Sequence, residues 1–261
     1  MDRFFSVIVL LAIMPLSTAL TQERQEQSSR QDVSAVLQAN NGAILAVRIE
    51  NLWSHFKGRP YLSGTLTPAG EIEELIVRLD GFDCITWIDH SVALLSAQNW
   101  EEYHANLISN RYFNHEISFS ARRHFFTDWL EQAEWEVPLF AQQANSSKVL
   151  NRRSDSTRWI MGQPFVEREI HWLPTDSLTN CSHLLMNGDL VGFYTELEGL
   201  DVNHVGMLQI NSGKPWLLHA SSGAGSLERV DFIEYASTKS GVIIIRKQWL
   251  FEQSIQSTPE D

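Results

Sequence analysis

The chain has only two cysteines, and one of them, Cys84, stands in a sequence that favours reactivity. It follows Gly81-Phe82-Asp83 and begins an apolar segment that predicts a helix over 84–97, with Asp83 as the N-cap. A thiol at a helix N-terminus meets unpaired backbone N–H groups and the positive end of the helix dipole, and both favour the thiolate. Because the thiolate is the nucleophilic form, these residues predict a cysteine hydrolase, provided that a histidine lies beside the thiol.

Two of the nine histidines are placed to act on that thiol. His204 lies within a predicted strand, 202–210, and His219 ends the next one, 215–219. Their positions differ by an odd number, so an even-length hairpin loop puts both side chains on one face of the sheet. An odd-length loop or a bulge would separate them. The set predicts Cys84 as nucleophile, His204 as base and His219 as the group that orients the base.

Other chemistries find less support in the sequence. His115-Glu116 lacks the second histidine of a zinc-protease helix, and the cysteines do not have metal-ligand spacing. The sequence contains no Gly-rich phosphate loop and no Gly-x-Ser-x-Gly elbow. We therefore expect neither a metal nor a cofactor.

The N-terminus predicts export. Arg3 precedes an apolar stretch, 4–16, and Ser17-Thr18-Ala19 supplies small residues for cleavage, so we expect a signal peptide over 1–19. The stretch is too short to cross a bilayer, and no later one is long enough, so we expect a periplasmic or secreted protein without a membrane span. A formal charge of −12 without a basic stripe argues against nucleic acid as a partner.

The rest of the chain has the composition of one domain, 32–250, between a polar flexible leader, 20–31, and a frayed tail, 251–261. Hydrophobic spacing predicts helices first and strands afterwards, while residues 136–185 are assigned no regular pattern beyond loops at 145–147 and 152–156. The predicted helices are 33–56, 84–97, 100–109 and 121–135, and the predicted strands are a short one near 76–77, then 189–195, 202–210, 215–219, one near 229, and 241–246. This order predicts an α+β fold in which the Cys84 helix packs on a C-terminal antiparallel sheet, an arrangement that resembles papain.

Four motifs resemble, in their order, the NlpC-type papain-like cell-wall hydrolases. They are Phe82-Asp83-Cys84, Gly188-Asp189-Leu190-Val191-Gly192-Phe193, His204-Val205-Gly206 and His219-Ala220-Ser221. The resemblance implies the same nucleophile, base and third residue as the argument from spacing. One departure is that Ile85-Thr86 replaces the usual small Ser-Gly after the cysteine.

With this departure and several further segments, roughly residues 55–246 resemble a narrower family, the N-acetylmuramoyl-L-alanine amidase-like proteins. The shared features are Pro60-Tyr61, Arg111-Tyr112, the run 122–129 with Phe125 in place of the usual tyrosine, and Leu200-Asp201-Val202 followed by Asn203 in place of threonine. The family implies hydrolysis of the amide between N-acetylmuramic acid and L-alanine in bacterial peptidoglycan or its fragments. It also implies a substrate-binding set, which is Tyr61, Asp83, Arg111, Tyr112, Arg122, His124, Asp128, Trp129 and Asn203.

Three arginines, Arg111, Arg122 and Arg123, suit such a substrate because a stem peptide carries carboxylates and a guanidinium binds a carboxylate in a bidentate manner. The alternative is that they pair with Asp128 or Glu116 and hold helices together. Two other functions also fit the sequence. One is an endopeptidase of the same fold that cuts within the stem peptide. The other is a non-catalytic cell-wall binding module with a Cys84–Cys181 disulfide.

Overall fold

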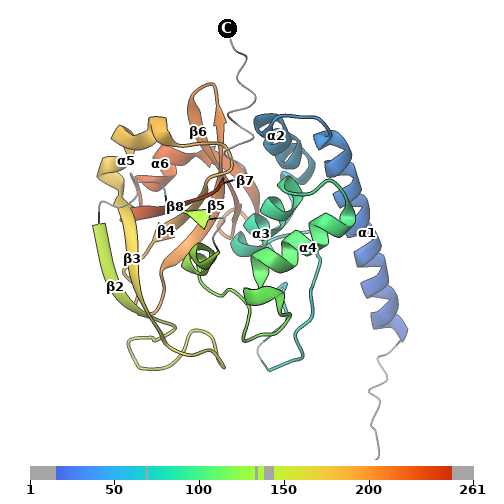
Figure 1. Cartoon of the computed structure of the whole chain (residues 1–261), viewed down its shortest axis with the longest axis horizontal. Coiled ribbons are helices and arrows are strands. Elements are labelled where there is room, and N and C mark those ends of the chain that lie inside the picture. The colour runs from blue at the N-terminus through green and yellow to red at the C-terminus, as the bar shows by residue number, and fades with distance from the viewer. Residues whose placement is uncertain (1–15, 69, 133–134, 138–143, 249–261) are drawn as a thin grey trace, which may run out of the picture.

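Helices form the N-terminal part of the chain and most strands the C-terminal part in the computed structural model, which describes residues 16–68, 70–132, 135–137 and 144–248 (Figure 1). The helices are α1 (Leu16–Asn40), α2 (Leu45–Phe56), α3 (Cys84–Leu95), α4 (Trp100–Arg111), α5 (Thr175–Cys181) and α6 (Phe232–Ala236), with 3-10 turns η1 (Phe113–His115), η2 (Phe126–Glu131) and η4 (Ser182–Leu184). The strands are β1 (Trp135–Glu136), β2 (Ala144–Leu150), β3 (Val166–Pro174), β4 (Leu190–Tyr194), β5 (Val202–Asn211), β6 (Lys214–Ser221), β7 (Ser226–Asp231) and β8 (Gly241–Lys247). The predicted α+β class is confirmed.

The strands form one antiparallel sheet in the order β2-β3-β8-β4-β5-β6-β7, and β1 pairs with β8. Strands β4 to β7 are neighbours in sequence and in space, as the predicted meander requires. Strand β8 then returns to the far side of β4, where it also pairs with β3. The sheet therefore has β4 and β5 near its middle, well supported on both sides.

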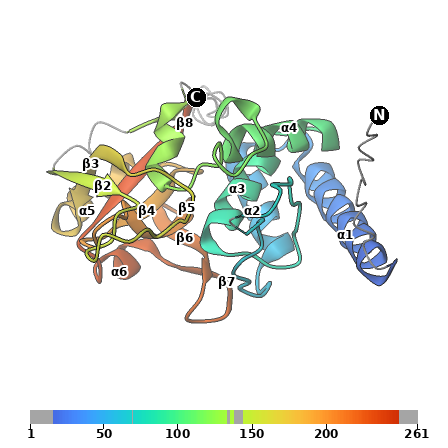
Figure 2. The same ribbon diagram turned by 90° about the horizontal axis from the view of Figure 1, so that it is seen from below.

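Two hydrophobic clusters cover the two faces of this sheet. In β8, Ile243 and Ile245 join the cluster formed with α1 to α4, while Val242 and Ile244 join the cluster formed with α5 and α6. This alternation follows from the two-residue period of a strand, and its continuous apolar run indicates burial on both faces. Figure 2 shows α1 to α4 on one side of the sheet, with α1 outermost.

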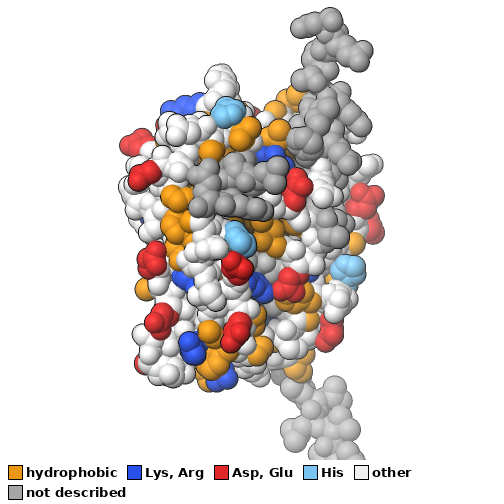
Figure 3. Space-filling model, turned by 60° about the vertical axis from the view of Figure 1, so that its left-hand side comes forward, with side chains coloured by type: hydrophobic (Ala, Val, Ile, Leu, Met, Phe, Trp, Pro, Cys, Tyr) orange, Lys and Arg blue, Asp and Glu red, His pale blue; other side chains and the backbone are white. Residues whose placement is uncertain are grey.

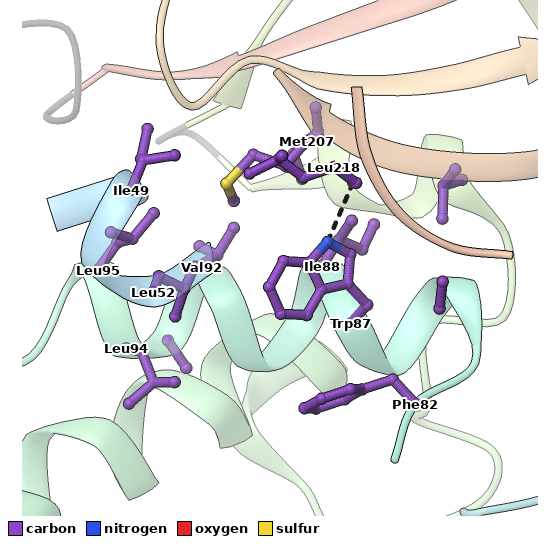
Figure 4. Packing of buried hydrophobic residues seen from close by; sticks show 14 of the residues in the cluster. Ile49, Leu52, Phe82, Trp87, Ile88, Val92, Leu94, Leu95, Met207 and Leu218 are labelled. Carbon is purple, nitrogen blue, oxygen red and sulfur yellow. Dashed lines mark hydrogen bonds between the residues drawn. The ribbon is translucent and has the colours of Figure 1, made fainter. Parts of the chain in front are cut away.

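Helix α3 begins where the sequence predicts and lies at the centre of the larger cluster. Asp83 and Thr86 form a reciprocal capping box, in which the Asp83 carboxylate accepts the Thr86 N–H at 2.7 Å and the Thr86 hydroxyl accepts the Asp83 N–H at 3.0 Å. Trp87 packs edge-on against Phe82, and its indole N–H donates to the Leu218 carbonyl of β6 at 3.0 Å (Figure 4). The helix is thereby fixed to the sheet.

The segment 20–31 belongs to α1, so the prediction of a flexible leader is wrong. Although the segment is polar, it makes specific contacts. The buried Ser29 hydroxyl donates to the Val77 carbonyl at 3.2 Å, and the Arg30 guanidinium lies 4.1 Å from the centre of the Trp100 ring. One residue beyond the segment, Asp32 pairs with Arg59 at 2.7 Å. Residues 1–15 of the predicted signal peptide and the predicted tail lie outside the described residues. None of the helices in the described part of the chain has the length and apolar character needed to cross a membrane.

Three other predicted elements differ from the structure, and in two of them side chains bind the local backbone. The predicted helix 33–56 is interrupted between α1 and α2. Near 76–77 there is no strand, since the Ile76 carbonyl accepts from Arg111 at 2.8 Å. The predicted helix 121–135 shrinks to η2, because the Asp128 carboxylate takes the backbone N–H groups of His124 and Phe125, at 2.9 and 2.8 Å.

Residues 145–147, predicted as a loop, lie in β2, which pairs along its whole length with β3. Strand β2 shows no clear apolar alternation, because its side chains before Leu150 are only partly buried or are exposed. A strand held chiefly by its ladder leaves little trace in hydrophobic periodicity.

A methyl group at Gly206, in β5, would meet the neighbouring strand. It would lie 2.9 Å from the Leu218 carbonyl oxygen and 3.1 Å from the His219 Cβ, so we expect Gly206→Ala to lower the free energy of unfolding by about 1–3 kcal/mol. Gly223→Ala is the matched control, since the nearest atom to its new methyl is 3.9 Å away. Urea unfolding of both variants tests this, and equal stabilities would contradict the packing described.

Candidate active site

The β5–β6 hairpin brings His204 and His219 together as the spacing predicts. The strands are joined by a two-residue turn, Ser212 and Gly213, whose positive φ values of 52° and 73° fit the primed turns of tight hairpins. This even-length loop puts both histidines on one face, and His204 Nε2 lies 2.7 Å from His219 Nδ1. The predicted same-face pair is confirmed.

The registered pairs of β5 and β6 end at Met207 and Leu218, and the start of α3 packs against both strands there. The Trp87 indole takes the Leu218 carbonyl, and the Val205 N–H is directed at the Cys84 sulfur. Cys84 therefore lies against the residue that follows His204 in β5.

Burial decides the protonation of this site. Burial raises the pKa of the Cys84 thiol to about 11, with a further contribution from the Asp83 charge, although the N–H groups of Val205, Ile85 and Cys84 itself act in the opposite direction. The expected resting thiolate is therefore wrong, because loss of water outweighs the helix start.

The same cause keeps both imidazoles neutral. Burial lowers the pKa of His204 to about 4, assisted by His219 and the Lys239 charge, and lowers that of His219 to about 4, assisted by Lys239. At neutral pH the site holds a neutral thiol beside two neutral imidazoles.

The hydrogen bond within the pair restricts the tautomers. When His204 Nε2–H donates to His219 Nδ1, His204 Nδ1 is left with a lone pair that can accept a proton from the thiol. His219 then carries its proton on Nε2, a buried atom with no hydrogen-bond partner among the described residues.

Three residues of the predicted substrate-binding set lie around this site. Tyr61 forms an isolated β-bridge with Phe82. The pKa of its hydroxyl is raised by burial and then by the charges of Cys84 and Asp83, so the hydroxyl lies near the thiol. Asp83 is the N-cap of α3, and Asn203 is exposed next to His204 in β5. Tyr61 and Asn203 are thus available at the rim.

The other members of that set have structural partners, beginning with the arginines. Arg111 is 3% exposed, and its guanidinium pairs with Asp89 at 2.7 Å. Arg122 and the Tyr112 hydroxyl both bind Glu73, the hydroxyl at 2.6 Å. Arg111, Tyr112 and Arg122 therefore have partners within the protein, which are neither Asp128 nor Glu116, and their binding of substrate stays a prediction.

His124, Asp128 and Trp129 are also held internally. His124 Nε2 lies 3.0 Å from the Phe119 carbonyl, and the Asp128 carboxylate caps η2 and pairs with Arg168 at 2.6 Å. Trp129 is buried edge-on against Trp135, with ring centres 5.0 Å apart. These contacts hold all three residues within the protein, and their binding of substrate stays a prediction.

The two cysteines are not joined by a disulfide and lie on opposite faces of the sheet. Cys84 packs against the cluster of α1 to α4, and Cys181 belongs to the cluster of α5 and α6. The alternative of a Cys84–Cys181 disulfide is therefore wrong. Sequence reasoning missed Tyr235, on α6, whose ring centre lies 5.0 Å from that of His219. Nothing in the local pattern around a five-residue helix singles it out.

Acidic side chains are spread over the face of the molecule drawn in Figure 3 and outnumber the basic ones there. The distribution agrees with the formal charge of −12.

The fold and this site place the chain among known proteins. A model of the AmiA-like family, described as N-acetylmuramoyl-L-alanine amidase-like, matches residues 51–242, and the chain belongs to this family. A search of curated proteins found no significant match.

Several solved structures share the fold. A Legionella pneumophila protein from a family of unknown function superposes with a TM-score of 0.71 at 18% identity, covering 86% of this chain and 96% of its own. A protein described as a xylanase from Bacteroides fragilis gives 0.63 at 24% identity, with coverages of 75% and 98%. An N-acetylmuramoyl-L-alanine amidase from Bacteroides uniformis gives 0.62 at 21% identity, with coverages of 75% and 96%. At these identities the likenesses establish the fold.

The buried pair of Arg111 and Asp89 yields a test of the structural role. Arg111→Met leaves the Asp89 carboxylate buried without its partner, so we expect the free energy of unfolding to fall by about 3–5 kcal/mol. Adding Asp89→Leu removes the stranded charge and restores most of the loss. Urea unfolding measures both. A stable Arg111→Met variant whose only defect is a higher KM would contradict the structural role and indicate that Arg111 binds the substrate.

Proposed function

We propose that the protein is an exported cysteine amidase that hydrolyses the bond between N-acetylmuramic acid and L-alanine in peptidoglycan or its fragments. The observation that carries the proposal is the contact of Cys84, at the start of α3, with the Val205 N–H of β5, next to His204 of the hydrogen-bonded histidine pair. Membership of the amidase-like family supports the substrate class, and we infer an arrangement of the NlpC papain-like type.

The first half of the reaction forms a thioester. The Cys84 sulfur attacks the lactyl carbonyl carbon while the thiol proton passes to His204 Nδ1, and the carbonyl oxygen becomes an oxyanion. The Cys84 N–H at the start of α3 is a donor for this charge, worth on the order of 3 kcal/mol. When the intermediate collapses, the carbon–nitrogen bond breaks and His204 gives its proton to the L-alanine nitrogen.

The second half releases the sugar acid. Water attacks the thioester carbon as His204 takes its proton, and the tetrahedral intermediate expels the Cys84 sulfur, which recovers the proton from His204. The products are a lactyl carboxylic acid and a peptide with a free amino group. His219 keeps the His204 ring in the orientation and tautomer that both halves need.

A neutral thiol and a neutral imidazole suit this scheme. His204 is unprotonated and able to accept, and the thiol delivers its proton only as the sulfur–carbon bond forms. The charges that develop, an imidazolium and an oxyanion, arise together in a site with little water, where fixed backbone dipoles stabilise them strongly.

Recognition of the substrate falls to residues at the rim, since Arg111 and Arg122 are occupied. The Tyr61 hydroxyl and the exposed Asn203 amide are suited to hydrogen-bond the polar groups of a muropeptide. Export through a signal peptide over 1–19, with a periplasmic or secreted product, completes the proposal. N-terminal analysis of the exported protein would find Leu20 first if cleavage follows Ala19.

The test is digestion of purified muropeptides with analysis of product masses. We expect Cys84→Ala to lose several orders of magnitude in rate, as removal of a nucleophile does. Cys181→Ala is the matched control and keeps the native rate, because Cys181 lies on the other face of the sheet.

Product masses separate the candidate reactions. The proposed amidase frees peptides that begin with L-alanine, whereas an endopeptidase leaves L-alanine attached to the sugar. Native activity of Cys84→Ala, or products cut only within the stem peptide, would refute the proposed reaction.

A further inference from the structure

Tyr235 encloses the histidine pair from the side of α6. Its ring centre lies 5.0 Å from that of His219 at an interplanar angle of 64°, and 6.0 Å from that of His204 at 42°. Phe193 stacks on His204 with ring centres 6.0 Å apart and contacts Tyr235 at 5.0 Å. The two imidazoles are therefore flanked by two aromatic rings, Tyr235 of α6 and Phe193 of β4.

The same tyrosine also lies within electrostatic range of the thiol. The pKa of the Tyr235 hydroxyl is raised by burial and then by an ionised Cys84. Among the described residues, no other aromatic ring of α6 is in contact with the histidine rings. Tyr235 thus contacts both imidazoles and lies near the thiol.

Tyr235 also holds a cation. The Lys239 ammonium lies 4.9 Å from the centre of the Tyr235 ring, a cation–π contact. The backbone of Lys239 is fixed, because its N–H donates to the Ala236 carbonyl at 2.8 Å and its carbonyl accepts from the Thr175 hydroxyl at 2.7 Å. The ammonium is therefore kept close to the pair.

The charged and titratable groups around the pair come from several elements. Cys84 faces it from the start of α3, with Asp83 and Tyr61 beside the thiol. Tyr235 faces it from α6, and Lys239 follows that helix. Glu228 of β7 stands opposite His219 in the ladder. Of these groups Lys239 is the permanent cation, and its charge disfavours a proton on either imidazole.

We propose that Tyr235 is a positioning residue: its ring holds His204 and His219 in their hydrogen-bonded arrangement and fixes the Lys239 ammonium beside them, which keeps the base neutral in acidic conditions. The inference rests on the proposed function for its catalytic meaning. It predicts an amidase that remains active well below the pH at which an ordinary histidine becomes protonated.

Removal of the Tyr235 ring changes both the hydration of the histidines and the position of the Lys239 ammonium. Water reaches the imidazoles and stabilises their protonated form, and the Lys239 ammonium moves into solvent where its charge is screened. Both changes raise the histidine pKa toward 6.5. Because protonated His204 cannot act as a base, activity is then lost on the acidic side first.

The experiment compares kcat/KM against pH for the full-length mature protein and its variants on a muropeptide. For the native protein we expect the acidic limb near pH 4, and for Tyr235→Phe a profile within about twofold of it, since the ring is kept. For Tyr235→Ala we expect the limb to move toward pH 6, so that the rate at pH 5 falls about tenfold more than the rate at pH 8. For Lys239→Met we expect a smaller movement in the same direction, because burial is the largest cause of the low histidine pKa.

Tyr194→Ala is the matched control, because Tyr194 also carries a cation–π contact, with Lys148 at 4.6 Å, but packs on Trp172. It lowers stability without moving the acidic limb. If Tyr235→Ala does not fold, Tyr235→Leu keeps apolar volume and serves in its place. An equal loss of rate at all pH values, or a defect in Tyr235→Phe as large as in Tyr235→Ala, would overturn the inference.

Imidazole NMR titrations separate this inference from the proposed function. The His204 and His219 signals of the native protein titrate near pH 4, and those of Tyr235→Ala titrate at higher pH, whether or not the protein cuts muropeptides. An inactive native protein with this NMR shift refutes the amidase and keeps the positioning role. An active native protein whose histidine signals do not shift in Tyr235→Ala keeps the amidase and refutes the positioning role.

Discussion

The site depends on the packing of the start of α3 against strands β5 and β6. The registered pairs of these strands end at Met207 and Leu218, beside the helix start. The Trp87 indole satisfies the Leu218 carbonyl at 3.0 Å, and the Val205 N–H turns to the Cys84 sulfur. The interaction that anchors the helix thus also sets the thiol beside the histidine strand.

The cost of this placement is loss of water, and it governs the chemistry. Helix α3 is buried between α2, α4 and the sheet, so its first residue is dehydrated although it stands at a helix start. Burial raises the pKa of Cys84 to about 11 and lowers that of His204 to about 4, which leaves a neutral pair. Such a site would develop charge only with substrate in place, where the backbone donors at the start of α3 can stabilise it.

The sequence predicts those parts of the structure whose determinants are local. The N-cap position of Asp83 and the odd spacing of His204 and His219 both act through nearby backbone geometry, and both predictions are confirmed. By contrast, Glu73 lies 49 positions before Arg122, so no local pattern reveals that this arginine is occupied. Strands β2 and β3, the cation beside the histidines and the protonation of Cys84 likewise depend on contacts between distant segments.

The central claim is that Cys84 is a partly buried, neutral thiol at the start of α3, held against the Val205 N–H of β5. Its most direct test is the pH dependence of iodoacetamide alkylation of Cys84 in the Cys181→Ala variant, followed by mass spectrometry between pH 5 and 11. The structure predicts a rate that rises throughout this range, with an apparent pKa of about 11. A fast rate that is constant from pH 5 to 8 would reveal a preformed thiolate–imidazolium pair and contradict the account.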